Sequence, residues 1–442
     1  MLYTRFRRLF RSRLLRLITI LLAIWTFLEA FTIQRNLIAA EIQPSSQTNE
    51  EKIFLAFLPW NNEYVLRTHL INQLRDLVHA LGIEHVFLSI YENGSYDGTK
   101  DALRDLHAEL EGLGVRSRVI LDETTHEDIV NGRPTSPKEG WIQINKAGYE
   151  AFGVNQGDFA LRRIYYLAKL RNKVLEPLAD LAAKGERFDK ILFLNDVTYT
   201  ADDILTLLHT RNGNYAAACT LDFELPPTFY DTFALRDSNG DPALMHTWPY
   251  FASSASRNAV LAGKPVPVQS CWNGIVAMST SPFYNHTLAE DDGPPLRFRG
   301  VPDTLALQHI EGSECCLIHY DNPLANPLGN WINPAVRVGY CHPGLMKAKF
   351  AYDWDLFKRV CSWAYEAVHP GEGRSWVGLW RVAAGMWENR LRRLVHVGGL
   401  QNWKVKRRVR EWERGGKGRR EVGEACLVDE MQVIEPHGWL HA

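Results

Sequence analysis

One carboxylate in this sequence stands where a sheet could hold a cation. The stretch KILFLNDV (residues 190–197) contains four consecutive apolar residues and stops at Asn195 and Asp196. Such a short apolar run predicts a strand buried on both faces, as in a parallel sheet covered by helices. Because open α/β sheets bind ligands at the carboxyl ends of their strands, Asp196 could hold a divalent cation and, through it, a diphosphate. The alternative is that Asp196 only ends the strand.

A second polar turn is expected at the same edge of the sheet. The stretch YENGSYDGT (residues 91–99) follows a predicted strand and precedes a predicted helix. Glu92 and Asp97 would therefore lie near Asp196, and the glycine-containing backbone could approach a nucleotide closely. We expect Glu92 and Asp97 to contact the nucleoside.

Two further clusters carry residues that suit sugars and diphosphates. In PVPVQSCWNGI, Trp272 could stack on a sugar face while Asn273 and Gly274 contact hydroxyls, the alternative being a buried Trp in a tight turn. In RFRG, Arg297 and Arg299 could neutralise diphosphate oxygens, because a guanidinium matches their geometry.

The stretch EGSECCLIHYD follows shortly after RFRG and adds a third carboxylate. Glu314 is a candidate acid, base or nucleophile within it. His319 or the later His342 could be a further metal ligand, although a structural histidine is the alternative for each.

Alternating strands and helices must position these residues. Their alternation over the first 120 residues predicts a parallel, Rossmann-like sheet in an α/β fold. Residues 122–157 and 226–303 lack this regularity and predict loops around the crevice. The predicted strands are residues 53–60, 86–91, 118–121, 190–197 and 215–223; the predicted helices are residues 64–81, 99–113 and 162–175, with a further helix capped by Thr200 and Asp203.

The amino terminus has the pattern of a membrane anchor. Six arginines precede an apolar run over residues 17–33 that only Glu29 interrupts. At about 1.5 Å per residue the run spans about 25 Å, close to a thin bilayer. The arginines place the amino terminus in the cytosol and the rest of the chain in the lumen. A signal peptide cleaved near Ala39 and Ala40, or a mitochondrial presequence, are the alternatives.

A lumenal location would give meaning to two other features. Asn93 and Asn285 begin N-glycosylation sequons. The seven cysteines fit no zinc pattern and could pair in an oxidising lumen, with at least one left free because their number is odd. The spacing alone assigns no pairs.

The composition describes a folded chain without a strong overall charge. The 442 residues are 46% hydrophobic and 23% charged, and the net charge of −1 gives no field that would attract nucleic acid. Residues 353–442 differ from the rest, since they are rich in Trp and contain a basic run over residues 390–420. That run could touch anionic lipid or acidic partners, or form a solvated helix on the flank of the domain.

Several motifs together resemble a known family. KILFLNDV, FYDTFALRD, WPYF, PVPVQSCWNGIVAM, RFRG and SECCLIHYD, in this order, are similar to the fungal capsule-associated α-1,3-mannosyltransferases. The resemblance implies a GT-A glycosyltransferase fold, GDP-mannose as the donor, a glycan or glycoconjugate acceptor, Mn²⁺ or else Mg²⁺ as the cation, and transfer with retention. It also implies a single-pass type II Golgi protein. The expected divisions are a cytosolic tail (residues 1–16), an anchor (17–33), a stem (34–51), a catalytic domain (52–352) and an extension (353–442).

The resemblance also assigns roles to individual residues. Asp196 stands where the family has its metal-binding carboxylate, but the usual Asp-x-Asp is reduced here to Asn195, Asp196 and Val197. A second acidic ligand is therefore not identified. The expected catalytic residues are Asp196 and Glu314; Asn195 would contact the nucleotide sugar; and mannose and the acceptor would be arranged by Trp272, Asn273, Gly274, Asp231 and Arg236.

Other functions share parts of this pattern. A glycosyltransferase that uses UDP-xylose would keep the fold and the chemistry. A carbohydrate-binding relative without activity would keep the fold and the Trp-rich loops, and the missing second Asp favours it. A glycoside hydrolase would need two carboxylates facing each other across a sugar and would need no nucleotide.

Overall fold

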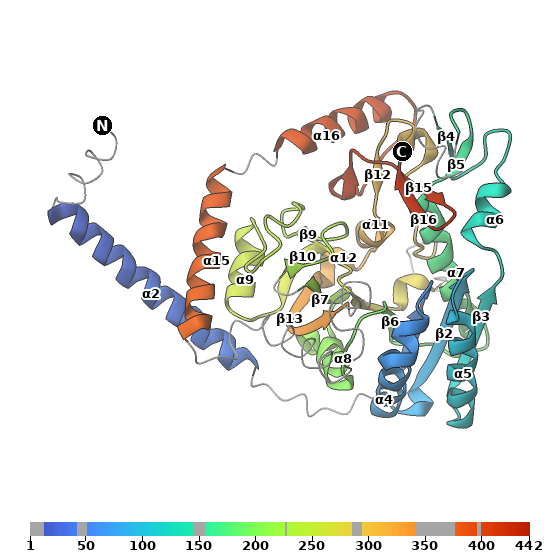
Figure 1. Cartoon of the computed structure of the whole chain (residues 1–442), viewed down its shortest axis with the longest axis horizontal. Helices are drawn as coiled ribbons and strands as arrows, with labels where there is room; N and C mark the ends of the chain where they lie inside the picture. Colours follow the sequence, from blue (N-terminus) through green and yellow to red (C-terminus); the bar gives the residue numbers. More distant parts are fainter. Residues whose placement is uncertain are drawn as a thin grey trace.

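The structure, a computed structural model, describes residues 13–41, 51–144, 155–225, 228–284, 294–340, 376–395 and 399–442. Ten strands of the described chain form one mixed sheet in the order β3-β2-β1-β6-β11-β7-β13-β10-β9, with β8 paired to β7 (Figure 1). The first four are parallel, and β11 lies antiparallel between β6 and β7. Their bounds are β3 Arg116–Asp122, β2 Val86–Asn93, β1 Ile53–Phe57, β6 Lys190–Leu194, β11 Ile275–Ser279, β7 Ala217–Leu225, β13 Asn330–Gly339, β10 Val266–Ser270, β9 Arg236–Asp237 and β8 Thr228–Phe229.

Side chains alternate along each strand, so the two faces of the sheet belong to different apolar cores. In β1, Phe54 and Ala56 face one core, while Ile53, Leu55 and Phe57 face the other. The first core is covered by α7 (Arg163–Ala183) and α11 (Glu314–Asp321), and the second by α4 (Ile71–Leu81), α5 (Thr99–Gly112) and α8 (Ala201–Leu208). Burial on both faces explains why the parallel strands are continuously apolar.

The predicted α/β class is confirmed; the expected parallel arrangement holds for β3, β2, β1 and β6, whereas the antiparallel β11 makes the sheet mixed. The expected strands and helices are present with shifted ends, and Thr200 and Asp203 form the expected capping box of α8. Residues 122–157 differ from the expected loop, because they contain a helix and a short strand in addition to residues outside the described part. The other elements are α3 Glu63–Val65, η1 Leu66–Leu70, η2 Ile83–His85, α6 His126–Asn131, β4 Trp141–Gln143, β5 Phe159–Leu161, η4 Thr210–Gly213, α9 Ser254–Leu261, η5 Ser281–Phe283, α10 Asp303–Ala306, β12 Glu311–Gly312 and α12 Ala325–Leu328.

The last part of the chain returns to the sheet domain. After α15 (Trp376–Val395) and α16 (Gly399–Arg414), it forms η6 Glu424–Cys426, β14 Leu427–Val428, β15 Gln432–Glu435 and β16 Gly438–His441. A disulfide joins Cys316 of α11 to Cys426, and β14 pairs with β12. In α16, Val405, Val409 and Trp412 are buried against the domain. The basic run over residues 390–420 therefore includes a helix whose apolar face packs on the domain. This agrees with the interpretation of the run as a solvated helix on the flank of the domain.

Among the described residues, one helix is long and apolar enough to cross a membrane. Helix α2 (Arg13–Glu41) contains a candidate span at Leu15–Leu37. It projects from the rest of the molecule at its amino-terminal end and packs along α15 at its other end (Figure 1). This agrees with the anchor expected from the sequence.

Candidate active site

Asp196 lies at the carboxyl end of β6, where the sequence predicted it. The preceding residue, Asn195, is fixed by its backbone N–H, which donates to Gly274 O at 3.1 Å. Asp196 itself accepts a hydrogen bond from Asn62 Nδ2 at 2.9 Å. Since Asn62 follows the neighbouring parallel strand β1, two adjacent strand ends deliver these groups to one edge of the sheet.

The polar turn after β2 is tied to the same edge. Asn62 N–H donates to Thr99 Oγ1 at 2.7 Å, so the loop that holds Asp196 also holds the start of α5. Asp97 accepts from the backbone N–H of Thr99 at 3.0 Å and from that of Glu63 at 3.1 Å. Asp97 thus organises the turn. Its carboxylate accepts these two hydrogen bonds at an exposed position.

Glu92 is also directed inward. It is fully buried and accepts a hydrogen bond from the backbone N–H of Ser95, and burial raises the pKa of its carboxyl group. Lys100 Nζ lies 3.7 Å from the carboxylate. Glu92 therefore supports the turn from the interior, which differs from its expected contact with a nucleoside, while the contact expected of Asp97 stays a prediction.

The turn over residues 271–274 is held in place covalently and sterically. Cys271 forms a disulfide with Cys219 of β7. Asn273 and Gly274 have positive φ angles of 53° and 83°. A Cβ atom at Gly274 would lie 2.7 Å from Val338 Cγ2, so any other residue there would have to displace that side chain and adopt a strained φ angle.

Trp272 fills the space beneath this turn. It is only 3% exposed, and its Nε1 donates to Asn195 Oδ1 at 3.4 Å. The rings of Phe193 and Phe298 lie 5.1 and 5.8 Å away. The expected stacking on a sugar therefore differs from the structure, which places Trp272 as a buried support for Asn195.

An arginine connects Trp272 to Glu314. The Arg171 guanidinium carbon lies 4.3 Å from the centroid of the Trp272 ring, and its Nε donates to Glu314 Oε1 at 3.0 Å. Glu314 is 2% exposed at the start of α11, so the ion pair compensates a charge that burial would otherwise disfavour. The adjacent Cys315 is a buried free thiol whose pKa is raised by burial.

Two more carboxylates lie beside the turn. Asp231 accepts from the backbone N–H groups of Phe233 and Ala234 at 3.1 Å and of Asn273 at 3.2 Å. Asp222 Oδ1 accepts from the Asp231 backbone N–H at 3.2 Å and from Asn273 Nδ2 at 3.4 Å.

The environments of these two carboxylates differ. Burial, followed by the charge of Asp231, raises the pKa of Asp222 to about 8. Burial also raises the pKa of Asp231, but its three backbone donors oppose the shift. The geometry thus favours a protonated Asp222 at neutral pH.

Tyr340, which follows β13, is the last residue that contacts this set of polar side chains. Asn195 Nδ2 donates to Tyr340 Oη at 3.5 Å, and the Tyr230 ring lies 4.8 Å from the Tyr340 ring. Burial, and then the charges of Asp222 and Asp196, raise the pKa of Tyr340. The phenol therefore stays neutral beside the carboxylates.

Two predicted site residues are engaged elsewhere in the protein, and a third lines another pocket. Arg299 forms ion pairs with Asp321 and Glu421, at 2.6 and 2.8 Å, which correct the expected contact with a diphosphate. Arg236 donates to backbone oxygens that include Phe233 O at 3.0 Å and Cys426 O at 3.2 Å. Arg297 lines a separate pocket of about 240 Å³ with Arg118, Asn172 and Glu176.

Among the described residues, the predicted histidine does not form a metal site and the predicted sequon does not form an accessible glycosylation site. His319 Nε2 lies 2.6 Å from Cys271 O, and burial lowers the pKa of this histidine to about 4, as suits a neutral structural residue. Asn93 is only 5% exposed at the end of β2, where a glycan would have no room. His342 and Asn285 lie outside the described residues.

The donor set fits a cation only if the substrate completes it. Within the described residues, no three His, Cys, Asp or Glu side chains gather as metal ligands. Asp196 offers one carboxylate. Mg²⁺-like ions are often held by one or two carboxylates together with substrate phosphates and water, and Asp196 fits that arrangement.

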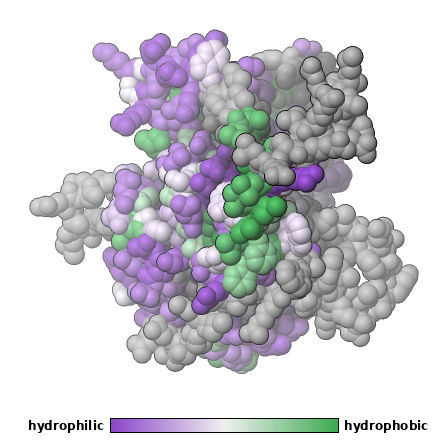
Figure 2. All heavy atoms as spheres, turned by 90° about the vertical axis from the view of Figure 1, so that its left-hand side faces the viewer, coloured by the Kyte–Doolittle hydropathy of each residue, from purple (hydrophilic) through white to green (hydrophobic). Residues whose placement is uncertain are grey.

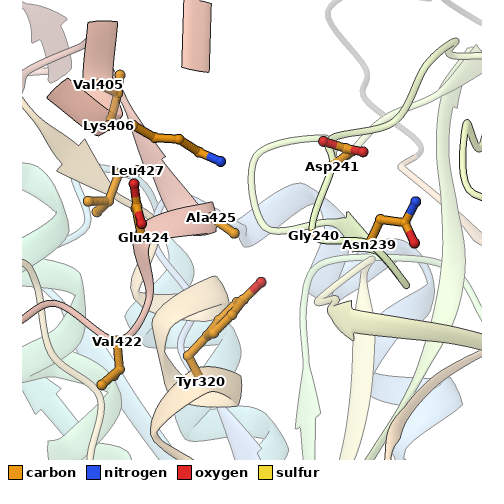
Figure 3. Close-up of a pocket in the computed structure, with 10 residues that line it drawn as sticks. All are labelled: Asn239, Gly240, Asp241, Tyr320, Val405, Lys406, Val422, Glu424, Ala425 and Leu427. Atoms are coloured by element: carbon orange, nitrogen blue, oxygen red, sulfur yellow. The ribbon is translucent and has the colours of Figure 1, made fainter. Parts of the chain in front are cut away.

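A separate hollow lies between the sheet domain and the returning carboxyl-terminal segment. It has a volume of about 250 Å³, and Figure 3 shows Lys406 and Glu424 on one side, Asp241 on the other and Tyr320 reaching in from below. Asp196, Trp272 and Glu314 do not line it. The candidate site is therefore distinct from this pocket.

Sequence reasoning missed Asn62, Arg171 and Tyr340. Arg171 carried a signal, because it occupies the buried stripe of α7 formed by Ile164, Ala168, Leu175 and Leu178. A charged residue in such a stripe needs a buried partner. Asn62 and Tyr340 lie in connecting segments without periodicity, so only the fold brings them to Asp196.

Comparisons with known proteins point to one family. The model of the family described as cryptococcal mannosyltransferase 1 matches residues 52–321, more than half of the chain. An alpha-1,3-mannosyltransferase, CMT1 of Cryptococcus neoformans, is 28% identical over 288 residues, which cover 61% of this chain and 54% of the relative. The chain thus matches about half the length of that relative.

Solved structures show more distant similarities. A mannosyltransferase from Pyrobaculum calidifontis in complex with GDP-Man and Mn²⁺ is 9% identical with a TM-score of 0.32, over 85% of this chain and 86% of that one. Glucosyl-3-phosphoglycerate synthase from Mycobacterium tuberculosis is 14% identical with a TM-score of 0.28, over 69% of this chain and 73% of that one.

Proposed function

Because the chain belongs to the family of cryptococcal mannosyltransferase 1, we propose that it transfers mannose from GDP-mannose to a hydroxyl of a glycan or glycoconjugate. The observation that carries this proposal is the position of Asp196 at the carboxyl end of β6, where it is oriented by Asn62 from the neighbouring strand. The crevice at this edge is where α/β sheets bind nucleotides.

Asp196 would share a divalent cation, Mn²⁺ or Mg²⁺, with the diphosphate of the donor. When bound, the cation would neutralise the charge that develops on the leaving GDP. Asn62 fixes the Asp196 carboxylate, and Trp272 and Tyr340 fix the amide of Asn195 beside it. These contacts reduce the reorganisation needed when the donor binds.

Asp231 and Glu314 would serve the sugars. Asp231 is held by three backbone N–H groups and would accept a hydrogen bond from an acceptor or mannose hydroxyl. Glu314 would lie on the donor-sugar side, positioned by Arg171. Asp222, with its raised pKa, would keep its proton and limit the negative charge beside Asp231.

The relative suggests the stereochemistry. GDP-mannose is an α-linked donor, and the curated relative is an alpha-1,3-mannosyltransferase. We therefore infer transfer with retention and an α-1,3 linkage, in the synthesis of fungal cell-wall, capsule or glycoconjugate structures.

The proposed location is the Golgi membrane, with one spanning helix and a lumenal catalytic domain. The candidate span at Leu15–Leu37 supports the anchor, and the six arginines of the amino terminus support the orientation. The pairs Cys219–Cys271 and Cys316–Cys426 suit an oxidising compartment.

A donor screen tests the proposal against its alternatives. The full chain would be incubated with GDP-mannose, GDP-fucose, UDP-xylose and UDP-glucose, each with and without Mn²⁺, and hydrolysis and thermal stabilisation would be measured. We expect a metal-dependent response to GDP-mannose alone. A response to UDP-xylose would overturn the mannosyl assignment, and no response to any donor would favour the inactive carbohydrate-binding relative.

A further inference from the structure

Helix α15 is fastened to the sheet domain. Asn389, which is 1% exposed, donates from Nδ2 to Phe251 O at 3.0 Å. At Gly385 the helix backbone comes so close that a Cβ atom would lie 2.5 Å from Trp248 O. These contacts fix the position of α15 on the domain.

The same helix is also fastened to the candidate membrane span. Arg390 contacts Glu29 with nitrogen–oxygen distances of 2.6 and 2.8 Å, and Trp387 Nε1 donates to Thr26 Oγ1 at 3.2 Å. The Arg390 guanidinium carbon lies 4.6 Å from the centroid of a Trp25 ring. Between the helices lies an apolar cluster of Ala30, Ile33, Leu37, Leu379, Val382 and Met386.

These contacts explain the acidic residue inside the apolar run. Glu29 is the only charged residue between Leu17 and Ile33. An unpaired carboxylate in a spanning helix is costly, so it is expected to find a partner. Arg390 is that partner, and the catalytic domain is thereby joined to the anchor by a side-chain contact and not only through the chain.

The length of the candidate span, compared with the thickness of a bilayer, places α15 beside the lipid. The candidate span Leu15–Leu37 has 23 residues and extends about 34 Å at 1.5 Å per residue, slightly more than the roughly 30 Å of a hydrocarbon core. Contacts with α15 begin at Trp25 and continue to Leu37. Residues 15–24 alone extend only about 15 Å. A bilayer crossed by α2 must therefore reach α15.

Part of the face of α15 that is not packed against α2 or the domain is apolar, as a position beside the lipid requires. Its exposed apolar residues recur at helical spacing and form what we call the α15 stripe: Trp380, Ala384, Leu391, Leu394 and Val395. Leu394 is 82% exposed and Trp380 is 73% exposed, which is unusual for such side chains in water. Figure 2 shows hydrophobic residues gathered in a band on the side of the molecule that carries α2, with hydrophilic residues beside it. Arg392, paired with Glu388 at 2.8 Å, lies on the polar side of the helix.

We propose that the α15 stripe is a lipid-contact surface that seats the catalytic domain on the lumenal leaflet of the bilayer crossed by α2. The two helices are antiparallel, since Trp25 contacts Trp387 while the later residues of α2 meet Leu379 and Val382. The carboxyl end of α15, with Leu391, Leu394 and Val395, therefore points toward the bilayer interior. This inference rests on the membrane anchoring under the proposed function.

The test measures how close labelled positions lie to lipid. The full chain would be placed in nanodiscs whose lipids carry a quencher on their acyl chains, and a fluorophore would be attached to Leu391→Cys or, as a matched control, to the adjacent Arg392→Cys. The signal of the unmodified chain with its native cysteines would be subtracted. We expect quenching at Leu391→Cys that is at least about twofold stronger than at Arg392→Cys. Equal, weak quenching at both would overturn the proposal.

Two further variants separate the possible failures. Leu21→Cys reports on the anchor itself. If a deep quencher fails to act there, both the anchoring and the α15 contact are refuted; if it acts there but Leu391→Cys stays unquenched, only the α15 contact is refuted. Glu29→Arg is expected to reduce quenching at Leu391→Cys, and Glu29→Arg combined with Arg390→Glu is expected to restore it. Unchanged quenching in Glu29→Arg would contradict docking through this pair.

Discussion

The guanidinium carbon of Arg171 lies 4.3 Å from the centroid of the Trp272 ring. This contact connects the two carboxylates to which we assign catalytic roles. Arg171 also forms an ion pair with Glu314. Trp272 also donates a hydrogen bond to Asn195, which precedes Asp196. Helix α7 thus links the carboxyl end of β6 to the start of α11. The side chains that contact substrate in our proposal depend on this buried link.

Removing the charge of Arg171 should destabilise the protein. Arg171→Met leaves Glu314 buried without a cation, and we expect the free energy of unfolding to fall by about 3–5 kcal/mol. Denaturant unfolding measures this loss. Combining it with Glu314→Gln should restore most of the stability but not the transfer activity. Lys169→Met, which removes an exposed cation from the same helix, is the control. Full stability in Arg171→Met would contradict the role of the ion pair.

The stability of the protein should depend on pH through Asp222. Because its folded pKa is raised from 3.8 to about 8, the folded protein holds a proton that the unfolded chain releases. The stabilisation is complete below the unfolded pKa and is lost as the pH rises through the folded one. We expect urea midpoints to fall between pH 5 and about 8, and to fall less in Asp222→Asn. An identical slope in both proteins would speak against a protonated Asp222.

The carboxyl-terminal segment should be required for the fold. The Cys316–Cys426 disulfide spans 110 residues, and its loss is expected to cost about 2–5 kcal/mol. Cys426→Ala and Cys316→Ala should lower the melting temperature equally, and the double variant should be no worse than either one, because all three lose the same bond. Additive losses, or an unchanged melting temperature, would show that this bond does not tie the segment to α11.

The sequence predicted the sheet because its signals are local. The apolar runs of β1, β2 and β6 and the capping box at Thr200 depend only on neighbouring residues, and the structure confirms them. The position of Asp196 at a strand end followed from the same pattern. The predicted anchor matches α2 for the same reason, because the apolar residues of a candidate spanning helix are consecutive in the sequence.

The site was harder to predict because residue type does not fix a partner. Arg299 and Asp97 have suitable chemistry for a nucleotide sugar, but the fold engages Arg299 with Asp321 and Glu421, and Asp97 with the start of α5. The pairing of Arg299 with Glu421 joins segments far apart in the sequence, and Asp97 also accepts from the backbone of Glu63 in another segment. A single sequence without periodic signals in those segments could not reveal them.

The carboxyl-terminal extension expected over residues 353–442 also shows that long-range contacts cannot be predicted from composition. Residues 353–442 differ in composition from the rest, so a boundary at 352 was a reasonable prediction. The segment nevertheless supplies Cys426 to a disulfide with α11 and Glu421 to an ion pair with Arg299. Composition describes the surface of a segment better than its long-range contacts.

The measurement that tests the central claim most directly is transfer of labelled mannose from GDP-mannose to a mannoside acceptor by the wild type, Asp196→Ala and Asp202→Ala. Asp202 is an exposed carboxylate on α8 and serves as the control. We expect labelled disaccharide from the wild type and Asp202→Ala, dependent on a divalent cation, and at least about 100-fold less from Asp196→Ala at unchanged melting temperature. Equal transfer by Asp196→Ala, or a labelled product from UDP-xylose and none from GDP-mannose, would contradict the account.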